Sequence, residues 1–293
     1  MRLQKILKEV LVISLIVLGW WWIEKPDGNL HVVFCDVGQG DAVLIIKEDV
    51  QMLVDAGPGS AVMECLDGNM PFWDRKIEVV VNTHPDRDHI GGLDKVMNEF
   101  EVGKLVINGM RGENEDSQEV LELVKERGVE VVIPKAGDRI VMGEMEFDVW
   151  WPEDKQGEVM AWRDMGYGVG EEEEDMNKMS VVGLLSWNDF EVLLTGDIGQ
   201  EEELALKRSG VLRNVDVLKV SHHGSKFSSD EKFLEVVRPK EAVIMVGEKN
   251  SFGHPTDEVL MRLDQVGSRV WRTDEQGEIE IVSDGLGYWV EKP

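Results

Sequence analysis

Within residues 82–92, four side chains that could bind a metal fall inside six consecutive positions, directly after the apolar run 77–81. They are His84, Asp86, Asp88 and His89. A strand that ends in such a cluster presents imidazole and carboxylate groups together at a sheet edge, and divalent metals bind such combinations. A polar loop in which Asp88 or His89 only caps the following helix is the alternative, but four such side chains rarely coincide by chance. The segment therefore indicates a metal site.

Two later segments add candidate ligands where predicted strands end. Asp197 follows Gly196, and a carboxylate after a small residue can bridge two cations because each oxygen can bind one metal. Taken alone, this pair could equally form a turn or a helix cap. His222 and His223 follow the apolar stretch 215–220. Adjacent side chains on a strand point to opposite faces, so we expect His222 to be the ligand and His223 to contact a ligand or the substrate.

The elements that must position these side chains alternate between strands and helices in both halves of the chain. Helical periodicity appears at 93–100 and 117–127. Apolar runs bounded by turn residues predict strands at 180–187, 191–195 and 215–220, among others. In each half the polar cluster falls at the C-terminal end of a strand, which favours a single α/β or α+β domain.

The order of the motifs also carries a family resemblance. His-x-Asp-x-Asp-His at 84–89 resembles the His-x-His-x-Asp-His signature of the metallo-β-lactamase-fold hydrolases, with Asp86 in place of the second histidine. From residue 30 to about 282, the series resembles the C-terminal hydrolase domain of the ComEC competence proteins and their stand-alone relatives. Its segments are 36–42, 53–57, 177–182, 194–197, 218–225 and 252–255. The resemblance implies an α+β fold, a four-layer αββα sandwich, for residues 28–293.

The resemblance further implies how the ligands are shared between metal ions. One complete site is expected from four side chains: Asp88, His89, Asp197 and His222. A second is expected to use His84 and Asp86, with Asp197 bridging. Most family members place a further histidine between the two halves, but this sequence has none between positions 89 and 222. We expect one or two divalent ions as cofactors, zinc or manganese, because imidazole suits zinc and the additional carboxylates suit manganese.

Other motif residues are expected to surround the metals. In the ComEC-like proteins an Asn-x-x-Ser segment replaces the missing histidine, which implies that Asn177 or Ser180 lines the site. The side chains expected to contact the substrate or to hydrogen-bond a ligand are Asp36, Gln39, Asp41, Asp55, Asn177, Ser180, His223 and Ser225. Asp88 or Asp197 could orient the attacking water, and His254 could contact the substrate or protonate the leaving group. A role for His254 in helix entry alone is the alternative.

The overall charge limits the mode of nucleic-acid binding. The chain has 31 Lys and Arg against 58 Asp and Glu, a formal net charge of −27. Proteins that hold nucleic acid by neutralising phosphates carry a basic surface, so this balance argues against tight non-specific binding. Phosphodiester chemistry stays compatible with it, because bound cations can invert the local field. The stretch 153–176, rich in Glu, Asp and Gly, is expected to be an acidic surface insertion.

The N-terminal residues 1–25 are expected to form a hydrophobic signal anchor and linker. Basic residues precede the apolar run 10–23, as in a signal sequence, and the tryptophans at 20–22 suit a membrane interface. No small-x-small cleavage site follows. We therefore expect an uncleaved anchor in the cytoplasmic membrane with the main domain outside the cytoplasm. A secreted protein, or an interfacial helix on a cytoplasmic protein, is the alternative.

The two cysteines, Cys35 and Cys65, show no CxxC spacing. They indicate neither a disulfide framework nor a cysteine zinc site, and we expect two buried thiols, with a single bridge as the alternative.

Three functions follow from these observations. The first is a phosphodiesterase or nuclease that uses a metal-activated water, with single-stranded DNA as one possible substrate and DNA uptake as the family context. The second is a metallohydrolase of a small ester, such as a phosphodiester head group, a lactone or a thioester, which the acidic balance favours. The third is a non-catalytic metal-binding domain. The sequence indicates no protein partner.

Overall fold

The computed structural model describes residues 4–5, 8–12, 14, 26–110, 112, 114–153 and 176–292. Most of the expected N-terminal anchor and of the acidic insertion therefore lies outside the described residues. Among the residues that are described, no helix has the length and apolar character needed to cross a membrane.

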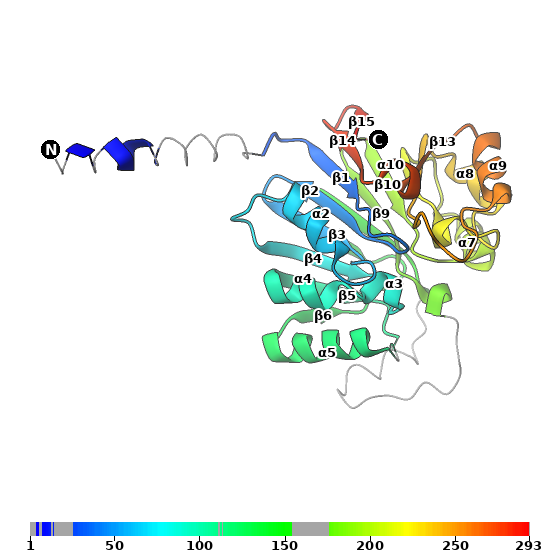
Figure 1. Ribbon diagram of the computed structural model, residues 1–293. Helices are drawn as coiled ribbons and strands as arrows, with labels where there is room; N and C mark the ends of the chain where they lie inside the picture. The colour runs from blue at the N-terminus through cyan, green and yellow to red at the C-terminus, as the bar shows by residue number, and fades with distance from the viewer. Residues whose placement is uncertain are drawn as a thin grey trace.

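Two β-sheets form the centre of the domain (Figure 1). The first contains β1 (Leu30–Phe34), β2 (Val43–Lys47), β3 (Val50–Val54), β4 (Lys76–Asn82), β5 (Glu101–Ile107), β6 (Glu130–Val132), β14 (Ile279–Ser283) and β15 (Tyr288–Lys292). The second contains β7 (Arg139–Met142), β8 (Met145–Trp151), β9 (Val182–Trp187), β10 (Phe190–Leu194), β11 (Val217–Lys219), β12 (Glu241–Ile244) and β13 (Arg269–Arg272). Their orders are β15-β14-β1-β2-β3-β4-β5-β6 and β13-β12-β11-β10-β9-β8-β7. Both sheets are mixed, which confirms the α+β prediction.

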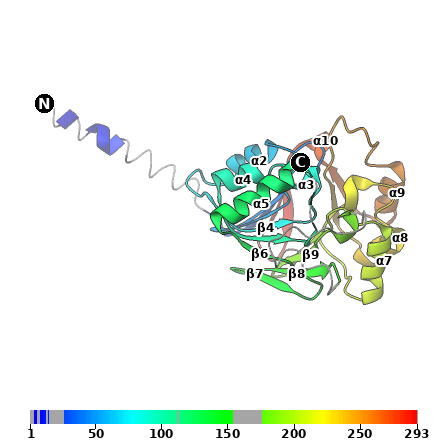
Figure 2. The same cartoon turned by 90° about the horizontal axis from the view of Figure 1, so that it is seen from below.

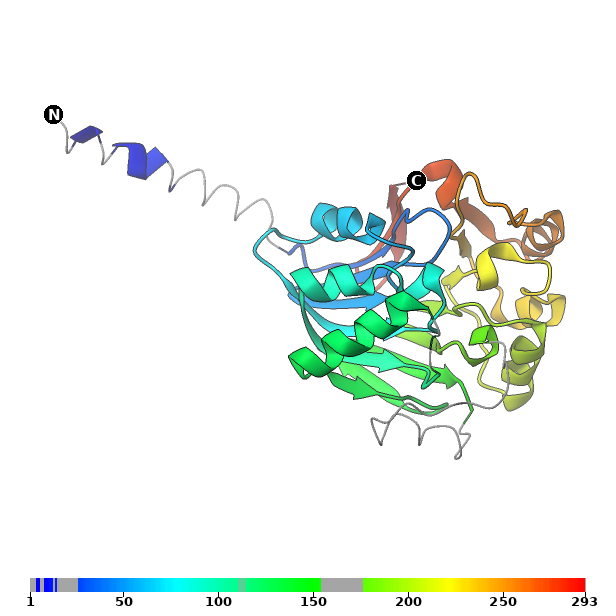
Figure 3. The same ribbon diagram turned by 60° about the horizontal axis from the view of Figure 1, so that its bottom comes forward.

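Helices cover the outer face of each sheet. Those of the first half are α2 (Ala61–Asn69), α3 (Arg87–Ile90), α4 (Leu93–Glu99) and α5 (Glu115–Arg127). Those of the second half are α7 (Gln200–Ser209), α8 (Glu231–Val237), α9 (Asp257–Gln265) and α10 (Thr273–Gln276), with the 3-10 turns η1 (Met176–Met179) and η2 (Ser221–Gly224). Figure 2 shows α2, α4 and α5 on one side of the molecule and α7, α8 and α9 on another. In Figure 3, α4 and α5 lie alongside each other over the first sheet.

The strand sequences create this layering because successive side chains alternate between the two faces. In β1, Val32 and Phe34 belong to the apolar cluster between the sheets, whereas Val33 belongs to the cluster under the first set of helices. In β10, Val192 faces the space between the sheets and Leu193 faces the second set of helices. Three buried apolar clusters thus separate helices, sheet, sheet and helices.

A disulfide links Cys35, which follows β1, to Cys65 in α2. The expectation of two free thiols is therefore wrong. The residues are 30 positions apart in sequence and show no local spacing signal, and they meet because α2 packs against the first sheet in one apolar cluster with both sulfurs.

Removing this disulfide is expected to lower the free energy of unfolding by about 3–4 kcal/mol, since a closed loop of this length restricts the unfolded chain. The measurement is urea unfolding of a Cys35→Ala/Cys65→Ala variant beside the wild type. Dithiothreitol should destabilise the wild type and leave the double variant unchanged. Equal stability of the oxidised wild type and the variant would contradict the prediction.

Candidate metal centre

The candidate site lies where parallel strands of the two sheets end. β3 pairs in parallel with β4 in the first sheet, and β10 pairs in parallel with β11 in the second. Parallel neighbours end at the same edge of a sheet, so residues that follow them converge. Asp55 follows β3, the ligand segment beginning at His84 follows β4, and Asp197 and His223 follow β10 and β11.

Four side chains form the centre of the site. They are Asp88, His89, Asp197 and His223, and one ligand atom of each lies within 4.8 Å of the others. His223 Nε2 is 3.2 Å from Asp88 Oδ2 and 3.3 Å from Asp197 Oδ2. His89 Nε2 is 3.4 Å from the same Asp197 oxygen. Two imidazoles and two carboxylates therefore surround one point from opposite sheets.

The backbone explains why His223 occupies this centre. β11 ends at Lys219, and the next turn places His222 (φ 50°) and His223 (φ 52°) in the left-handed region. The alternation of a strand no longer applies after such a turn. The strand rule predicts His222 as the ligand, but the structure places His223 in the cluster, whereas the ring centroid of His222 lies 5.9 Å from that of His254.

Hydrogen bonds orient both central imidazoles. Nδ1 of His89 is 2.8 Å from Asp55 Oδ2 and can donate to it, and Nδ1 of His223 can donate to the carbonyl oxygen of Met245 at 2.8 Å. In each ring Nε2 is then directed into the cluster, as in histidines that ligate metals. Asp55 itself accepts from the backbone N–H and the hydroxyl of Thr83, at 2.8 and 2.7 Å. The Asp55 side chain thus fixes the ligand loop and is not directed at the centre.

Opposite charges within the cluster shift the pKa values of its members toward their charged forms. Burial alone would lower the pKa of His223, but the carboxylates of Asp197 and Asp41 outweigh burial and raise it to about 10. Burial likewise opposes the charge of Asp197, yet His223, His89 and Lys219 hold its pKa well below the ordinary value. Burial would raise the pKa of Asp88, but the hydrogen bond from His223 and the charges of His89 and His223 together outweigh burial and lower it. Both carboxylates are therefore available as anionic ligands at neutral pH.

His84 and Asp86 form a smaller group beside this centre. His84 Nε2 lies 3.6 Å from Asp86 Oδ2, and its Nδ1 lies 3.3 Å from the hydroxyl of Ser180. Burial, assisted by the positive charge of His89, lowers the pKa of His84 to about 3, so its ring is neutral. Ser180 also accepts a hydrogen bond from the backbone N–H of Asp197 at 3.2 Å. Ser180 therefore joins the two groups.

The remaining predicted residues differ in the contacts that they make. Asp41 is buried and ion-paired inside the site, whereas Asp36 is exposed and accepts from the Gly38 N–H at 3.2 Å. Gln39 accepts from the Gly247 N–H at 3.2 Å. The backbone carbonyl oxygen of Asn177 accepts a hydrogen bond from the Ser180 N–H. The hydroxyl oxygen of Ser225 accepts one from the Phe227 N–H.

Lys219 is part of the site although no motif marked it. Its ammonium is buried, donates to the carbonyl oxygen of Gly196 at 2.9 Å, lies 3.3 Å from Asp197 Oδ1 and contacts Asp41 Oδ2. Asp41 in turn lies 3.4 Å from His223 Nδ1. A lysine at the end of an otherwise apolar strand, directly before the two histidines, is the sequence signal that could have identified it.

These residues fit a divalent cation. Nε2 of His84 and Nε2 of His89 are buried without a hydrogen-bond partner, and a buried polar atom in that condition requires an explanation. Imidazole nitrogens beside carboxylate oxygens suit zinc and manganese. The centre can hold one ion through Asp88, His89, Asp197 and His223, with His84 and Asp86 positioned beside it.

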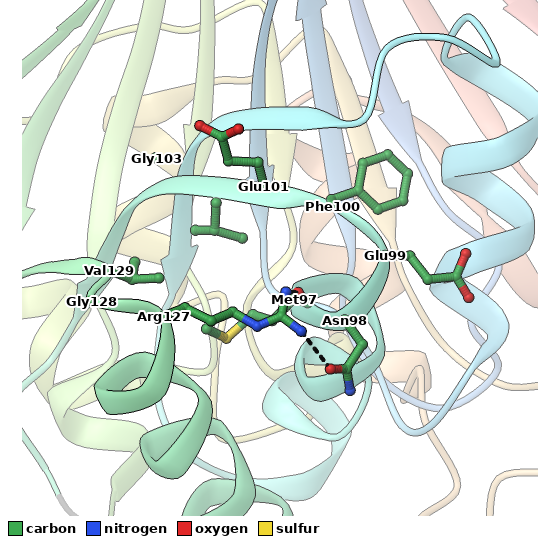
Figure 4. Close-up of a pocket in the computed structure, with 10 residues that line it drawn as sticks. Met97, Asn98, Glu99, Phe100, Glu101, Gly103, Arg127, Gly128 and Val129 are labelled. Carbon is green, nitrogen blue, oxygen red and sulfur yellow. Dashed lines mark hydrogen bonds between the residues drawn. The ribbon is translucent and has the colours of Figure 1, made fainter.

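A separate groove of about 540 Å³ lies between the end of α4, the start of β5 and the end of α5 (Figure 4). It is lined by Met97, Asn98, Glu99, Phe100, Glu101, Val102, Gly103, Arg127, Gly128 and Val129. The Arg127 guanidinium donates to Asn98 Oδ1 at 2.7 Å and to the Met97 carbonyl oxygen. Its one arginine is thus engaged within the protein, and no member of the metal cluster lines the groove.

Known proteins resemble this chain along most of its length. The model of the metallo-beta-lactamase superfamily matches residues 35–248. ComE operon protein 3 of Bacillus subtilis (strain 168) is 30% identical over 278 residues, which cover 87% of this chain and 33% of that protein. Competence protein ComA of Neisseria gonorrhoeae is 27% identical over 288 residues, 92% of this chain and 36% of that protein. The chain thus spans about a third of the length of these curated relatives.

A solved structure supports the same fold. The metallo-beta-lactamase fold protein YhfI from Bacillus subtilis superposes with a TM-score of 0.54 at 13% identity, covering 90% of this chain and 100% of that one. These comparisons confirm the resemblance to the ComEC-like proteins.

Proposed function

Because this chain belongs to the metallo-beta-lactamase superfamily, its enzymatic class is that of a metal-dependent hydrolase, and we propose that its substrate is a phosphodiester, single-stranded DNA in particular. The observation that carries the proposal is the cluster of four ligand atoms from both sheets. One relative is named as a competence protein, which supports DNA as the source of the phosphodiester.

In this proposal Asp88, His89, Asp197 and His223 hold the principal cation. His84 and Asp86 contribute to a second position, in which His84 is the one histidine. A divalent cation would supply a Lewis acid that offsets charge on a phosphoryl oxygen and favours deprotonation of water. Zinc and manganese are both compatible with this ligand set.

Asp88 is the member of the cluster that is open to solvent. Its side chain is 35% exposed, against 2% for His223 and 4% for Asp197. The substrate and the attacking water can therefore reach the centre from the Asp88 side. Because the carboxylate of Asp88 stays unprotonated at neutral pH, it can accept a proton from that water.

The ring of His254 packs edge-to-face against that of His222, with centroids 5.9 Å apart. Burial, with the nearby imidazoles of His222 and His223, lowers the pKa of His254, so its ring is neutral at pH 7. A neutral imidazole donates a hydrogen bond but is a weaker acid catalyst than an imidazolium. This favours substrate contact over protonation of the leaving group.

Hydrolysis of a small ester is the second candidate. A net charge of −27 repels a polyanion at long range, whereas a small ester with one charge or none experiences little repulsion. A phosphodiester head group, a lactone or a thioester would fit this preference.

We also propose that the domain works outside the cytoplasm, held at the cytoplasmic membrane by residues 1–25 or secreted. The disulfide between Cys35 and Cys65 supports this location, because disulfides persist in oxidising compartments. The test is alkylation of thiols in the cells that make the protein, before lysis. Two free thiols would argue for a cytoplasmic location.

The test of the substrate is hydrolysis by the purified protein in Mn²⁺ or Zn²⁺ of two compounds, a single-stranded oligonucleotide and bis(p-nitrophenyl) phosphate. We expect both to be cleaved, and an Asp88→Asn variant to lose about 100-fold or more in rate, the contribution typical of a general base. Cleavage of the small diester alone would support the second candidate and contradict the nuclease. Cleavage of neither would contradict a phosphodiesterase.

A further inference from the structure

A row of aromatic rings leads from the metal cluster to the protein surface. The ring centroid of His223 is 6.3 Å from that of His222, which is 5.9 Å from that of His254. The row ends at Phe252, whose ring stacks on His254 with centroids 5.9 Å apart and planes 26° from parallel. Phe252 is 67% exposed, so the outer face of the last ring meets solvent.

The loop that carries Phe252 is fixed against the site. Asn250 accepts a hydrogen bond from the His254 N–H at 3.0 Å and donates to the His254 carbonyl oxygen at 2.9 Å. Thr256 donates from its N–H to the carbonyl oxygen of Gly224, directly after His223, at 3.0 Å. The loop on the C-terminal side of Phe252 is thus tied to the ligand turn.

Exposure by itself does not distinguish this residue, since single exposed apolar side chains are common. Phe227 is 68% exposed, but the Lys226 ammonium lies 5.1 Å from its ring centroid. Phe72 is 57% exposed and precedes β4, whereas the metal cluster follows it. Phe252 differs from both because its ring continues a series that begins at a metal ligand.

The net charge of the protein indicates what kind of contact the aromatic row must make with a nucleic acid. With a net charge of −27, the protein gains little from neutralising phosphates, the usual source of affinity for nucleic acid. Stacking of bases on aromatic rings requires no basic residue and tolerates any base sequence. A row of aromatic rings beside a metal centre can therefore hold a strand that the overall charge repels.

We propose that Phe252, with His254 and His222 behind it, forms a nucleobase subsite, in which a base near the scissile phosphodiester stacks on the outer face of the Phe252 ring. This inference rests on the proposed function, because it assigns a position to part of the substrate. Phe252 acts here as a binding residue and takes no part in the proton transfers.

The experiment compares two fluorescently labelled strands of ten nucleotides that have the same backbone. One is oligothymidylate, and the other carries a base-free tetrahydrofuran residue at every position. Binding to the metal-loaded protein is followed by fluorescence anisotropy, and cleavage is followed separately on a gel. The variants are Phe252→Ala, Phe252→Trp and, as a matched loss of an exposed phenyl ring, Phe72→Ala.

We expect the wild type to bind oligothymidylate more tightly than the base-free strand. Phe252→Ala should weaken binding of oligothymidylate about tenfold, within the range measured for stacking residues, and leave the base-free strand unchanged. Phe252→Trp should retain the affinity, and Phe72→Ala should match the wild type on both strands. Binding should also lack the steep loss between 50 and 200 mM salt that is typical of basic proteins.

The two proposals fail in different measurements. Equal binding of the two strands by the wild type, or an equal loss of both in Phe252→Ala, would overturn the nucleobase subsite whether or not the strands are cleaved. Base-dependent binding without any cleavage would support the subsite and contradict the nuclease activity.

Discussion

Replacing His223 by asparagine is expected to weaken the binding of Zn²⁺ or Mn²⁺ more than about 100-fold, beyond the 10- to 100-fold loss typical of residues that only support a ligand. His223 Nε2 lies 3.2–3.3 Å from a carboxylate oxygen of Asp88 and of Asp197, so its loss removes a nitrogen donor from the middle of the cluster. Asparagine is chosen because it tolerates the left-handed backbone at this position. Isothermal titration calorimetry of the metal-free protein gives the affinity.

His222→Asn is the matched control, because His222 has nearly the same backbone conformation and lies outside the cluster. Its metal affinity should stay within a few-fold of the wild type. If His222→Asn lost the metal and His223→Asn kept it, the assignment drawn from the structure would be reversed. Similar urea unfolding curves of the two metal-free variants would show that neither result reflects misfolding.

Replacing Lys219 by methionine is expected to lower the free energy of unfolding of the metal-free protein by about 3–5 kcal/mol, the usual cost of removing one partner from a buried ion pair. The ammonium lies between two buried carboxylates, those of Asp41 and Asp197. Without it, these carboxylates stay buried close together and lose their common counter-charge. Urea unfolding in the presence of a chelator measures the change.

The loss should depend on pH in a defined direction. In the wild type, the charges of Lys219 and nearby histidines outweigh burial and lower the pKa of Asp41, so this carboxylate contributes stability above its unfolded pKa near 3.8. In Lys219→Met, burial would raise the pKa of Asp41 above the unfolded value. A carboxyl group whose pKa is raised in the folded state contributes stability at low pH and loses that contribution as pH rises. The loss of unfolding free energy in Lys219→Met should therefore be larger at pH 7 than at pH 5.

A second variant separates the ion pair from simple packing. Lys219→Met/Asp41→Asn removes the ammonium and one of the two carboxylates that it faces, so it should recover part of the stability lost in Lys219→Met. No recovery in the double variant, together with a deficit that does not vary with pH, would show that the methionine fails to pack and that the charges are unimportant.

The parts of the site that are contiguous in sequence could be predicted. His84, Asp88 and His89 are recognisable because one short loop carries all three after a clear strand. Asp197 is recognisable because a strand ends beside it. The layers follow from alternation within strands such as β1, where Val32 and Val33 face different clusters.

What could not be predicted depends on where strands stop and on distant contacts. The choice between His222 and His223 turned on a left-handed turn after Lys219, which the residue types do not reveal. From the sequence, Lys219 is simply the last residue of a strand. Its role in the site depends on its contact with Asp41, which is far from it in the sequence. The disulfide likewise requires knowing that α2 covers the end of β1.

The division of the ligands between two halves of the chain has a consequence for the integrity of the domain. Asp88 and His89 follow a strand of the first sheet, and Asp197 and His223 follow strands of the second. A cation bound by all four would act as a reversible cross-link between the two sheets, formed only after both have folded and packed together. At one hundred times its dissociation constant, such a ligand adds about 2.7 kcal/mol to the free energy of unfolding. The supply of metal in the surroundings would then determine how long the protein survives heat and proteases, as well as whether it turns over substrate.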